Sequence, residues 1–417
     1  MTRPLRVAVV ARAVMPLHGL GGLERSVHDL VRYLAARGVD VTLIVPPPGP
    51  MRRQSGDDPF ASPRIRLRHV PYLTFPLANR RGTTVLDRSS SYLLYGMRAG
   101  RFAVSLARQG QIDLIHGFGA SVLGAANPHR GVPLVLNPQG LEEFGATAAA
   151  LPALKRLGYT PLRWAVRRVA RSADRIIATD AALEPTVVRH LHPRANQLRT
   201  IPNGIDLVSV SALAGPADGL LMRHRHGIGT GEMVLLSVGR LEFNKGFDVL
   251  ARALAIAARP AGLLSVTGWR WVIVGAGPHR PAIEAEIERA GIGRHVVFAG
   301  RATEQELHAW YEAASVFVHP TRYEGSSLVT LEAMAHRRPI IGTIAGGLPD
   351  KIHPGVNGWL VEPGDVRALA DALEDAVSSA ARLNTFGAAS RQLVEREFAW
   401  SVLVDRQIEM YRELTGT

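Results

Sequence analysis

The feature that most constrains the fold is a double succession of apolar strand patterns that alternate with helical patterns. Each succession opens on an apolar, mostly β-branched run, Leu5–Val10 in the first and Met233–Val238 in the second. Strands that alternate with helices favour a parallel sheet covered by helices. A chain of 417 residues is too long for one ordinary core and suits two domains of roughly 200 residues each. We therefore expect an α/β protein with two such sheets.

The apolar periodicity places most of the elements. After the opening strand, a Gly-rich turn at 19–22 precedes a helical pattern that ends at Gly38. Residues 51–110 are rich in arginine and show no clear period, so we expect an irregular segment there. Further buried strands are predicted at Val39–Val45, Ile112–Ile115, Leu134–Leu136, Arg175–Thr179, Trp271–Val274, Val296–Phe298, Ser315–Val318 and Ile340–Ile341.

A Gly-, Ser- and Asp-containing stretch with Pro216, Asn203–Gly219, is typical of a linker. It predicts an N-terminal domain over residues 1–205 and a C-terminal domain over 206–397. The last stretch, 398–417, has a helical pattern and is expected to pack back toward the N-terminal domain.

The composition excludes several classes of site. There is no cysteine, so disulfides, thiolate metal sites and thiol nucleophiles are excluded. The fifteen histidines are scattered without metal-ligand spacing, so we expect no metal. The first apolar run is too short for a signal sequence, and no apolar stretch reaches the length of about 18 residues that spans a membrane. We expect a cytoplasmic protein, at most peripheral on a membrane surface.

The positive charge is confined to one half. Residues 1–205 hold 28 Lys+Arg and 12 Asp+Glu, a net of +16, whereas the remainder has a net of −3. The basic half indicates contact with an anionic membrane or a phosphate-bearing acceptor, or else a merely solvated surface. The basic amphipathic stretch 151–175 has the same two interpretations, a helix on anionic lipid or a surface helix over a sheet. A nucleic-acid-binding protein is a rival class, but no known binding motif is present and we expect no nucleic-acid partner.

The strongest motif is the segment Pro320–Ala335. It follows a predicted strand and carries Glu324 and Glu332, whose spacing along a loop and helix suits the distance from the hexose to the ribose of a nucleoside diphosphate sugar. Between these carboxylates a helix N-terminus is expected to offer backbone N–H groups to a diphosphate. These N–H groups belong to Gly325, Ser326, Ser327 and Leu328. The alternative is a plain strand–loop–helix with a capping serine.

A second motif, Ser237–Gly246, lies after the first strand of the second half. Ligands of open α/β sheets bind beyond such strand ends. Arg240 and Lys245 both reach that edge, where two cations would neutralise a leaving diphosphate in place of a metal. Lys245 is one of only three lysines against 46 arginines, which favours a required ammonium group. The alternative is an exposed loop with ordinary charges.

These two segments resemble those of glycosyltransferase family 4. The family's Gly-Arg-Leu…Lys-Gly loop and its two glutamates eight positions apart are both present. Further matching segments are Gly346–Asp350, Asn357–Val361, Asn203–Asp206 at the junction between domains, and the Gly-rich loop His18–Glu24. The resemblance covers nearly the whole chain.

The resemblance implies a GT-B fold, in which two Rossmann-like domains with parallel sheets face each other across a cleft. It implies a retaining, metal-independent glycosyltransferase without a cofactor, which moves a hexosyl unit from a UDP- or GDP-sugar to an acceptor hydroxyl. The C-terminal domain would bind the nucleotide sugar, and the N-terminal domain the acceptor. With the basic first half, this suggests a glycan or lipid-linked acceptor, as in envelope polysaccharide synthesis.

The family's residue roles transfer by position. The resemblance assigns Glu324 to the donor sugar hydroxyls and Glu332 to the ribose hydroxyls. It assigns both cations, Arg240 and Lys245, to the diphosphate. It places Arg301 near the base, and Gly21 and Gly22 at a close backbone approach to the donor.

The chain also departs from the family pattern. Many relatives have His-x-His where this chain has His116-Gly-Phe118, and a further frequent histidine position is occupied by Gln139. A glutamine side chain cannot act as a general base. His116 is kept as a candidate catalytic residue, with a core histidine as the alternative. A catalytically silent sugar-nucleotide-binding module is the second hypothesis for the function.

Overall fold

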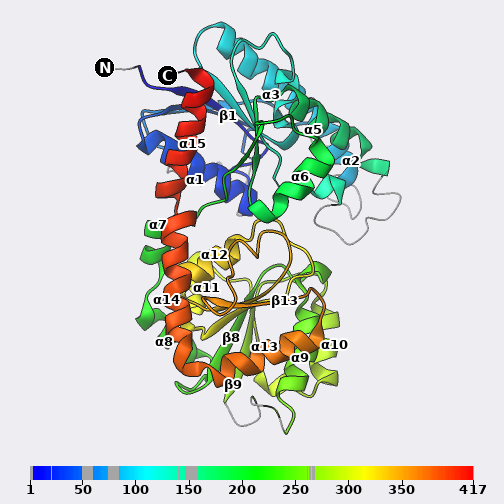
Figure 1. Cartoon of the computed structure of the whole chain (residues 1–417), viewed down its shortest axis with the longest axis vertical. Helices are drawn as coiled ribbons and strands as arrows, with labels where there is room; N and C mark the ends of the chain where they lie inside the picture. Colours follow the sequence, from blue (N-terminus) through cyan, green and yellow to red (C-terminus); the bar gives the residue numbers. More distant parts are fainter. Residues whose placement is uncertain are drawn as a thin grey trace. The chain divides into compact units, whose positions relative to one another are not determined.

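The computed structural model describes residues 3–19, 21–48, 60–73, 84–139, 141–145, 157–260, 262, 264 and 268–416. The chain divides into two compact units. Unit 1 comprises Met1–Asn203 together with Trp400–Thr417, and unit 2 comprises Gly204–Ala399. Each unit contains one parallel sheet with helices packed on it (Figure 1).

Unit 1 is built on a seven-stranded sheet with the order β3-β2-β1-β4-β5-β6-β7. Every pair of neighbours is parallel. The strand order reverses between β1 and β4, which is the topological switch point of such a sheet. The strands are β1 (Arg6–Val10), β2 (Asp40–Val45), β3 (Ile65–His69), β4 (Leu114–Phe118), β5 (Leu134–Asn137), β6 (Arg175–Ala178) and β7 (Leu198–Thr200).

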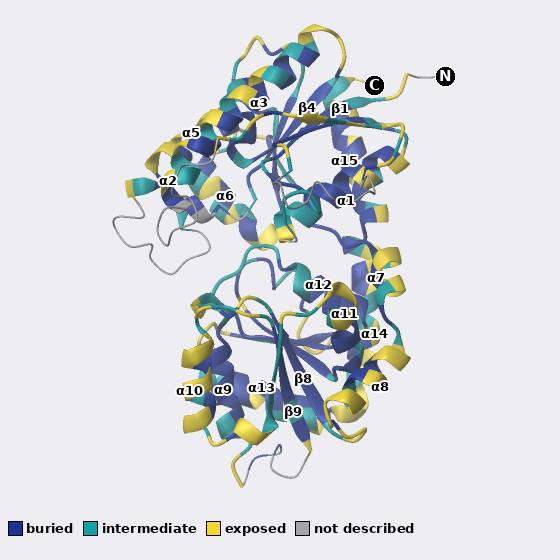
Figure 2. Cartoon of the chain, turned by 180° about the vertical axis from the view of Figure 1, so that it is seen from behind, coloured by how far each residue is buried: buried dark blue, intermediate teal, exposed yellow. Residues whose placement is uncertain are grey.

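Helices cover both faces of this sheet, as a parallel sheet requires. One apolar core joins β1 and β2 to α1 and α15, and a second joins the other face to α3 and α5. Figure 2 shows the inner strands of this sheet as mostly buried and the outer sides of the helices as exposed. The helices are α1 (Gly22–Ala36), α2 (Thr84–Ser89), α3 (Ser91–Arg108), α5 (Thr160–Ser172), α6 (Glu184–Leu191) and α15 (Trp400–Thr415), with short 3₁₀ turns η2 (Gly119–Ala125), η3 (Glu142–Phe144) and η4 (Ala181–Leu183).

The prediction of an irregular segment at 51–110 is wrong for its described residues. They form β3, α2 and the 18-residue helix α3. The period of α3 escaped detection because small residues line its packed face. A Cβ on Gly96 would lie 2.0 Å from the Ala120 carbonyl oxygen, and one on Gly124 would lie 2.1 Å from that of Met97. Helix α3 therefore approaches η2 closely through glycines, which interrupt the pattern of large apolar side chains that marks a helix in a sequence.

The last helix, α15, belongs to unit 1. Trp400 stacks on Tyr33 of α1 with ring centroids 6.3 Å apart. Arg37, which caps the end of α1, donates to the Asp405 carboxylate at 2.7 and 2.9 Å. Tyr411 is fully buried in the same core. The residues of α15 thus complete one face of the sheet.

Unit 2 repeats the architecture with a six-stranded sheet of order β10-β9-β8-β11-β12-β13. All neighbouring strands are again parallel. The order reverses between β8 and β11, so these two paired strands form its switch point. The strands are β8 (Met233–Val238), β9 (Trp269–Val274), β10 (Val296–Gly300), β11 (Val316–His319), β12 (Ile340–Thr343) and β13 (Gly358–Val361).

Two cores cover the faces of the second sheet. Large aromatic side chains fill them, and Trp269, Trp271, Trp310 and Phe317 are each at most 2% exposed. The helices are α7 (Leu207–Leu213), α8 (Pro216–Arg225), α9 (Phe247–Ala257), α10 (Arg280–Arg289), α11 (Glu304–Ala313), α12 (Leu328–Ala335), α13 (Val366–Ser378) and α14 (Leu383–Leu393), with short turns η5 (Phe243–Lys245), η7 (Gly293–His295), η8 (Ala380–Arg382) and the π-helical η9 (Val394–Phe398).

The predicted linker is largely helical. Asp206 caps α7 by accepting from the backbone N–H groups of Val208 and Ser209, and α8 begins at Pro216. Capping residues and turn residues are the same types, Asp, Ser, Gly and Pro, so the cluster also marks the starts of two helices. The division between the two units falls at its beginning, between Asn203 and Gly204. No helix among the described residues is long and apolar enough to cross a membrane.

Candidate active site

Three loops of unit 2 meet at the carboxyl end of its sheet, beside the switch point. The first follows β8 and contains η5, and the second follows β11 and contains Glu324. The third follows β12, and in it the N–H of Gly347 donates to the carbonyl of Gly325 at 3.1 Å. Because the loops that follow adjacent parallel strands all begin at the carboxyl end of the sheet, residues far apart in sequence come together here.

The centre of this site is a three-residue cluster. The Lys245 ammonium lies 2.6 Å from Oε2 of Glu324. The same oxygen accepts a hydrogen bond at 2.9 Å from Nε2 of His319, the last residue of β11. The side chains of Lys245 and Glu324 are 15% and 16% exposed, and His319 is fully buried. The cluster is thus largely shielded from water, and only Lys245 and Glu324 keep a small exposed fraction.

The cluster fixes the charge of its members. Burial raises the pKa of Glu324, but the attraction of Lys245 and the hydrogen bond from His319 outweigh it and hold that pKa well below its ordinary value. Burial lowers the pKa of His319, which keeps the imidazole neutral. Glu324 is therefore a permanent carboxylate at neutral pH, suited to accept hydrogen bonds and unable to act as a general acid.

A second set of contacts holds the two loops in register. Arg322 forms a two-pronged ion pair with Asp248 at 2.8 and 2.6 Å, and its guanidinium lies 4.0 Å from the centroid of the Phe243 ring. The Thr321 hydroxyl donates to the Asn244 carbonyl at 2.9 Å. These contacts place Lys245 next to Glu324 before any ligand binds.

Glycine is required where the loops touch. Gly246 has φ of +66°, and a Cβ there would lie 2.0 Å from the carbonyl oxygen of Pro320. Gly346 has φ of +53°, and its Cβ would lie 2.0 Å from the carbonyl oxygen of Glu324. Any side chain at either position would force the loops apart.

The remaining residues of the β11 segment lie around the start of α12. This helix begins at Leu328, with Ser327 as its N-cap, between the two glutamates as the sequence indicates. The Ser326 hydroxyl is buried and has no hydrogen-bond partner among the described residues. Glu332 is 5% exposed and accepts a hydrogen bond from the Tyr311 hydroxyl at 2.9 Å.

The predicted cations differ in their surroundings. Lys245 lies in the cluster, whereas the Arg240 side chain is 77% exposed and pairs with Glu242 at 2.5 Å. Arg301 directly follows β10 and is exposed. The structure therefore brings Lys245 and Glu324 into contact and leaves Arg240 and Arg301 on the surface of the unit.

In unit 1, Gly21 and Gly22 begin α1 and are exposed. The Glu24 carboxylate folds over them, so that a Cβ on Gly21 would lie 2.5 Å from its Oε2. A carboxylate is favourable at a helix N-terminus for the same reason as a phosphate.

The histidine of the N-terminal half lies in a core. His116 is 1% exposed, and its Nδ1 lies 2.5 Å from the Tyr411 hydroxyl of α15. Burial lowers the pKa of His116 to about 3, so the ring is neutral. Gln139 has φ of +60° and donates from its side chain to Asn137 at 3.0 Å. This environment favours the alternative of a core histidine.

Two supporting residues were missed in the sequence. His319 ends β11, one residue beyond the predicted strand. Its position directly before Pro320 was the only feature of the sequence that could have marked it. Lys351 is fully buried, donates to the Gly347 carbonyl at 3.0 Å and lies 5.4 Å from the centroid of the Phe398 ring. It fixes the third loop, and its rarity as a lysine was the available signal.

Comparisons with known proteins match both halves of the chain. Residues 20–209 match the family model described as Glycosyltransferase Family 4, and residues 232–379 match Glycosyl transferases group 1. A D-inositol 3-phosphate glycosyltransferase of Streptomyces scabiei is 27% identical, over 98% of this chain and 91% of the relative. A glycogen synthase of Mycobacterium tuberculosis is 26% identical, over 98% and 94%.

Solved structures share the whole fold. A sucrose-phosphate synthase from Thermosynechococcus elongatus matches with a TM-score of 0.77 at 25% identity, covering 99% of each chain. HepE from Anabaena, solved in complex with UDP, matches with a TM-score of 0.72 at 19% identity, covering 99% of this chain and 100% of its own. The two-sheet architecture is thus that of the GT-B fold.

Proposed function

Because the chain belongs to glycosyltransferase family 4, we propose that it moves a hexosyl unit from a UDP- or GDP-sugar to an acceptor hydroxyl, with retention and without a metal ion. The broader assignment is plain: the chain is a glycosyltransferase with a GT-B fold that takes its sugar from a nucleotide-sugar donor. The proposal concerns the type of donor, the stereochemistry and the residues responsible.

The observation that carries the proposal is the contact between Lys245 and Glu324 at the switch point of the unit 2 sheet. In the free enzyme each neutralises the other. When the donor binds, the diphosphate takes the place of Glu324 as partner of the ammonium. Glu324 then accepts hydrogen bonds from the sugar hydroxyls. On donor binding, Lys245 therefore binds the leaving phosphate and Glu324 binds the sugar.

The cation is needed because negative charge grows on the leaving phosphate as the glycosidic bond breaks. A fixed positive group in a shielded site stabilises that charge without reorganisation. The N–H groups at the start of α12 supply further donors to the diphosphate. Arg240 contributes from the exposed end, after exchanging Glu242 for a phosphate oxygen.

The bond changes follow from these groups. The acceptor oxygen attacks the anomeric carbon from the side on which the diphosphate leaves, so configuration is retained. The bond between the anomeric carbon and the oxygen of the leaving diphosphate breaks, and the proton of the acceptor hydroxyl passes to that oxygen. No protein base is required, which accords with a core location for His116. His319 is a positioning residue, since it holds Glu324 as a carboxylate.

The acceptor is proposed to be a glycan or lipid-linked molecule with anionic character, as in cell-envelope polysaccharide synthesis. The support is the charge of residues 1–205, a net of +16 against −3 for the remainder. An enzyme of this kind works in the cytoplasm, peripherally at the inner face of the membrane. The first part of the amphipathic stretch 151–175 lies outside the described residues, and most of the described part forms α5.

A donor screen tests the proposal. Thermal unfolding is followed with UDP-glucose, UDP-N-acetylglucosamine, GDP-mannose, and UDP or GDP alone. The true donor at about 100 times its Kd stabilises the fold by about 2.7 kcal/mol. UDP compounds are tested first because HepE is a UDP complex. If no nucleotide sugar raises the unfolding temperature above the effect of inorganic pyrophosphate, the proposed donor class is wrong.

The rival hypothesis, a silent sugar-nucleotide-binding module, is separated by turnover. The stabilising donor is incubated with the enzyme and a lipid extract, and release of UDP or GDP is measured. Release that depends on the extract and is lost in Lys245→Met supports transfer. Tight binding without release, with or without extract, supports the module.

A further inference from the structure

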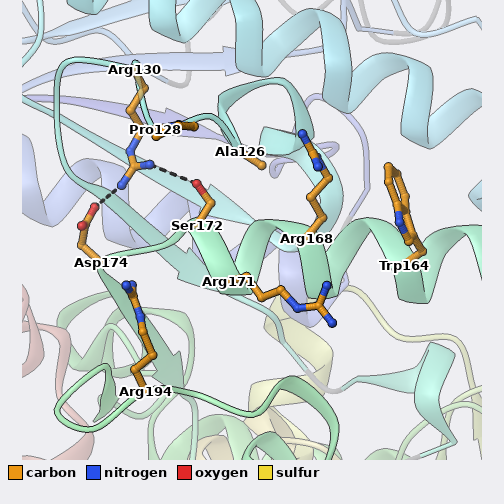
Figure 3. Close-up of a pocket in the computed structure, with 9 residues that line it drawn as sticks. All are labelled: Ala126, Pro128, Arg130, Trp164, Arg168, Arg171, Ser172, Asp174 and Arg194. Carbon is orange, nitrogen blue, oxygen red and sulfur yellow. Dashed lines mark hydrogen bonds and ion pairs between the residues drawn. The ribbon is translucent and has the colours of Figure 1, made fainter.

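A basic pocket lies in unit 1 beside the amino ends of the sheet strands. Substrates of such folds bind at the opposite, carboxyl ends. Its volume is about 520 Å³. Its walls are the loop that leads into β5, the junction between α5 and β6, and the loop between α6 and β7. All three precede their strands, so the pocket lies at the amino ends of β5, β6 and β7. The lining residues are Ala126, Pro128, Arg130, Trp164, Arg168, Arg171, Ser172, Asp174 and Arg194 (Figure 3).

The floor of the pocket is rigid. Arg130 is 8% exposed and pairs with Asp174, the only carboxylate of the lining. Arg130 also donates to the Ser172 hydroxyl and to the Val132 carbonyl, both at 3.0 Å. Asp174 accepts in addition from the backbone N–H of Leu134 at 2.8 Å. The Asp174 charge is thereby neutralised by partners within unit 1.

The cations of the rim are available to a ligand. Arg168 and Arg171 extend from α5 and are exposed, and neither has a hydrogen-bond or ion-pair partner among the described residues. Arg194, also exposed, uses one amino group on the Ala173 carbonyl at 2.8 Å. Four arginines against one aspartate give the lining a formal net charge of +3. Such a density of unpaired guanidinium groups is unfavourable unless an anion or counter-ions occupy it.

An aromatic ring lies beside these cations. Trp164 is 57% exposed and lies one turn before Arg168, whose guanidinium is 5.8 Å from the ring centroid. A large apolar side chain held at the surface next to arginines is typical of a site for a ligand with a charged and a non-polar part.

We propose that this pocket binds a phosphate group, with Arg168, Arg171 and Arg194 as its ligands and Trp164 covering the adjoining non-polar part of the molecule. The forked guanidinium matches the oxygens of a phosphate better than those of a smaller anion, and three of them exceed what one carboxylate can satisfy. The phosphate belongs to a soluble phosphorylated compound or to the headgroup of an anionic lipid. The site is separate from the Lys245–Glu324 cluster and does not depend on the proposed reaction.

The test compares two matched charge reversals in the full chain. Arg168→Glu with Arg171→Glu removes the rim cations. Arg66→Glu with Arg68→Glu is the control, because it changes the net charge by the same amount. Both arginines are exposed on β3, the edge strand at the other end of the strand order from β7. Both pairs are made in a Lys245→Met background, which weakens the proposed donor site, so that its remaining contribution is the same in the pocket variant and in the control.

Binding of inorganic pyrophosphate is measured by calorimetry. Affinity should fall at least about tenfold in the pocket variant and less than about threefold in the control, since charge-assisted contacts give way to repulsion. Binding to phosphatidylcholine vesicles is then compared with and without phosphatidylglycerol. If the pocket variant selectively loses binding to the vesicles but not to pyrophosphate, the ligand is a lipid headgroup. If it loses binding to pyrophosphate but not to the vesicles, the ligand is a soluble phosphorylated compound.

Two outcomes overturn the proposal. One is equal loss in the pocket variant and the β3 control, which means unspecific attraction to a basic unit. The other is absence of binding to both probes by the parent chain. Failure of glycosyl transfer in the donor assays leaves this result unaffected, because no step here involves turnover.

Discussion

Replacing Lys245 by methionine separates a buried cation from an exposed one, if Arg240→Met is made in parallel. Both residues are proposed to bind the donor diphosphate, but their side chains are 15% and 77% exposed. Methionine keeps much of the length of each side chain and removes its charge. The two variants thus differ mainly in how much water screened the lost cation.

The exposure sets the expected magnitudes. At about 4 Å, two unit charges interact by about 4 kcal/mol where the effective dielectric constant is about 20, and by about 1 kcal/mol in bulk water. Only the part that grows in the transition state affects the rate. We expect Lys245→Met to lower kcat/KM about 100- to 1,000-fold, as loss of a shielded charge-stabilising donor does. Arg240→Met should lower it about fivefold.

The assay is release of the nucleoside diphosphate from the donor found in the thermal screen, under kcat/KM conditions. Unfolding temperatures of both variants are measured alongside, since Lys245→Met leaves the Glu324 carboxylate with His319 alone. A variant Lys245→Met/Glu324→Gln restores neutrality and shows whether unfolding or chemistry is responsible. The reasoning is refuted if Arg240→Met is the more damaging change, or if Lys245→Met turns over at a near-normal rate.

Three further predictions concern stability. Because the folded pKa of Glu324 lies below the unfolded value of 4.5, its stabilisation is fully present above about pH 4.5 and lost as the pH falls toward the folded pKa; acid titration of the unfolding free energy should be flatter in Glu324→Gln. Gly246→Ala should cost more than the roughly 1 kcal/mol expected of Gly364→Ala in urea unfolding, because both have positive φ but only Gly246 has a carbonyl oxygen 2.0 Å from the new Cβ; equal costs would show that the loops separate freely. His116→Asn should lower the unfolding temperature and leave kcat within about threefold, since a core substitution acts on packing; a loss of turnover without a loss of stability would return His116 to the catalytic candidates.

The fold class was predictable because parallel strands buried on both faces leave continuous apolar runs. The run Met233–Val238 coincides with β8, and Leu134–Leu136 falls inside β5. The strand β3 was missed because it lies at an edge of the sheet, where Arg66 and Arg68 interrupt the apolar residues. Apolar periodicity in a sequence reflects the burial of large side chains. It is weak in an edge strand such as β3, which buries few of them, and in α3, where glycine and alanine lie between the buried large residues.

At the site, motif spacing put Lys245 and Glu324 near one edge but not in contact. The contact depends on the pairing of β8 with β11 and on the ion pair between Arg322 and Asp248, neither of which has a local pattern. The pairing of the exposed Arg240 with Glu242 could not be predicted from the motif either. Two cations in one motif appear equivalent in the sequence, and only their surroundings separate them. The roles proposed for both stay predictions until the variants are assayed.

The place of α15 has a consequence for synthesis. Residues 400–415 supply Trp400 and Tyr411 to the core of the sheet that starts at β1. A ribosome therefore delivers nearly two hundred intervening residues before α15 can complete this face of the first sheet. Until then, of the described helices, only α1 covers the face, and the apolar side chains that α15 buries face solvent or a chaperone. Nascent chains stalled before residue 400 should be cleaved by protease in their first two hundred residues, even where those of unit 2 resist.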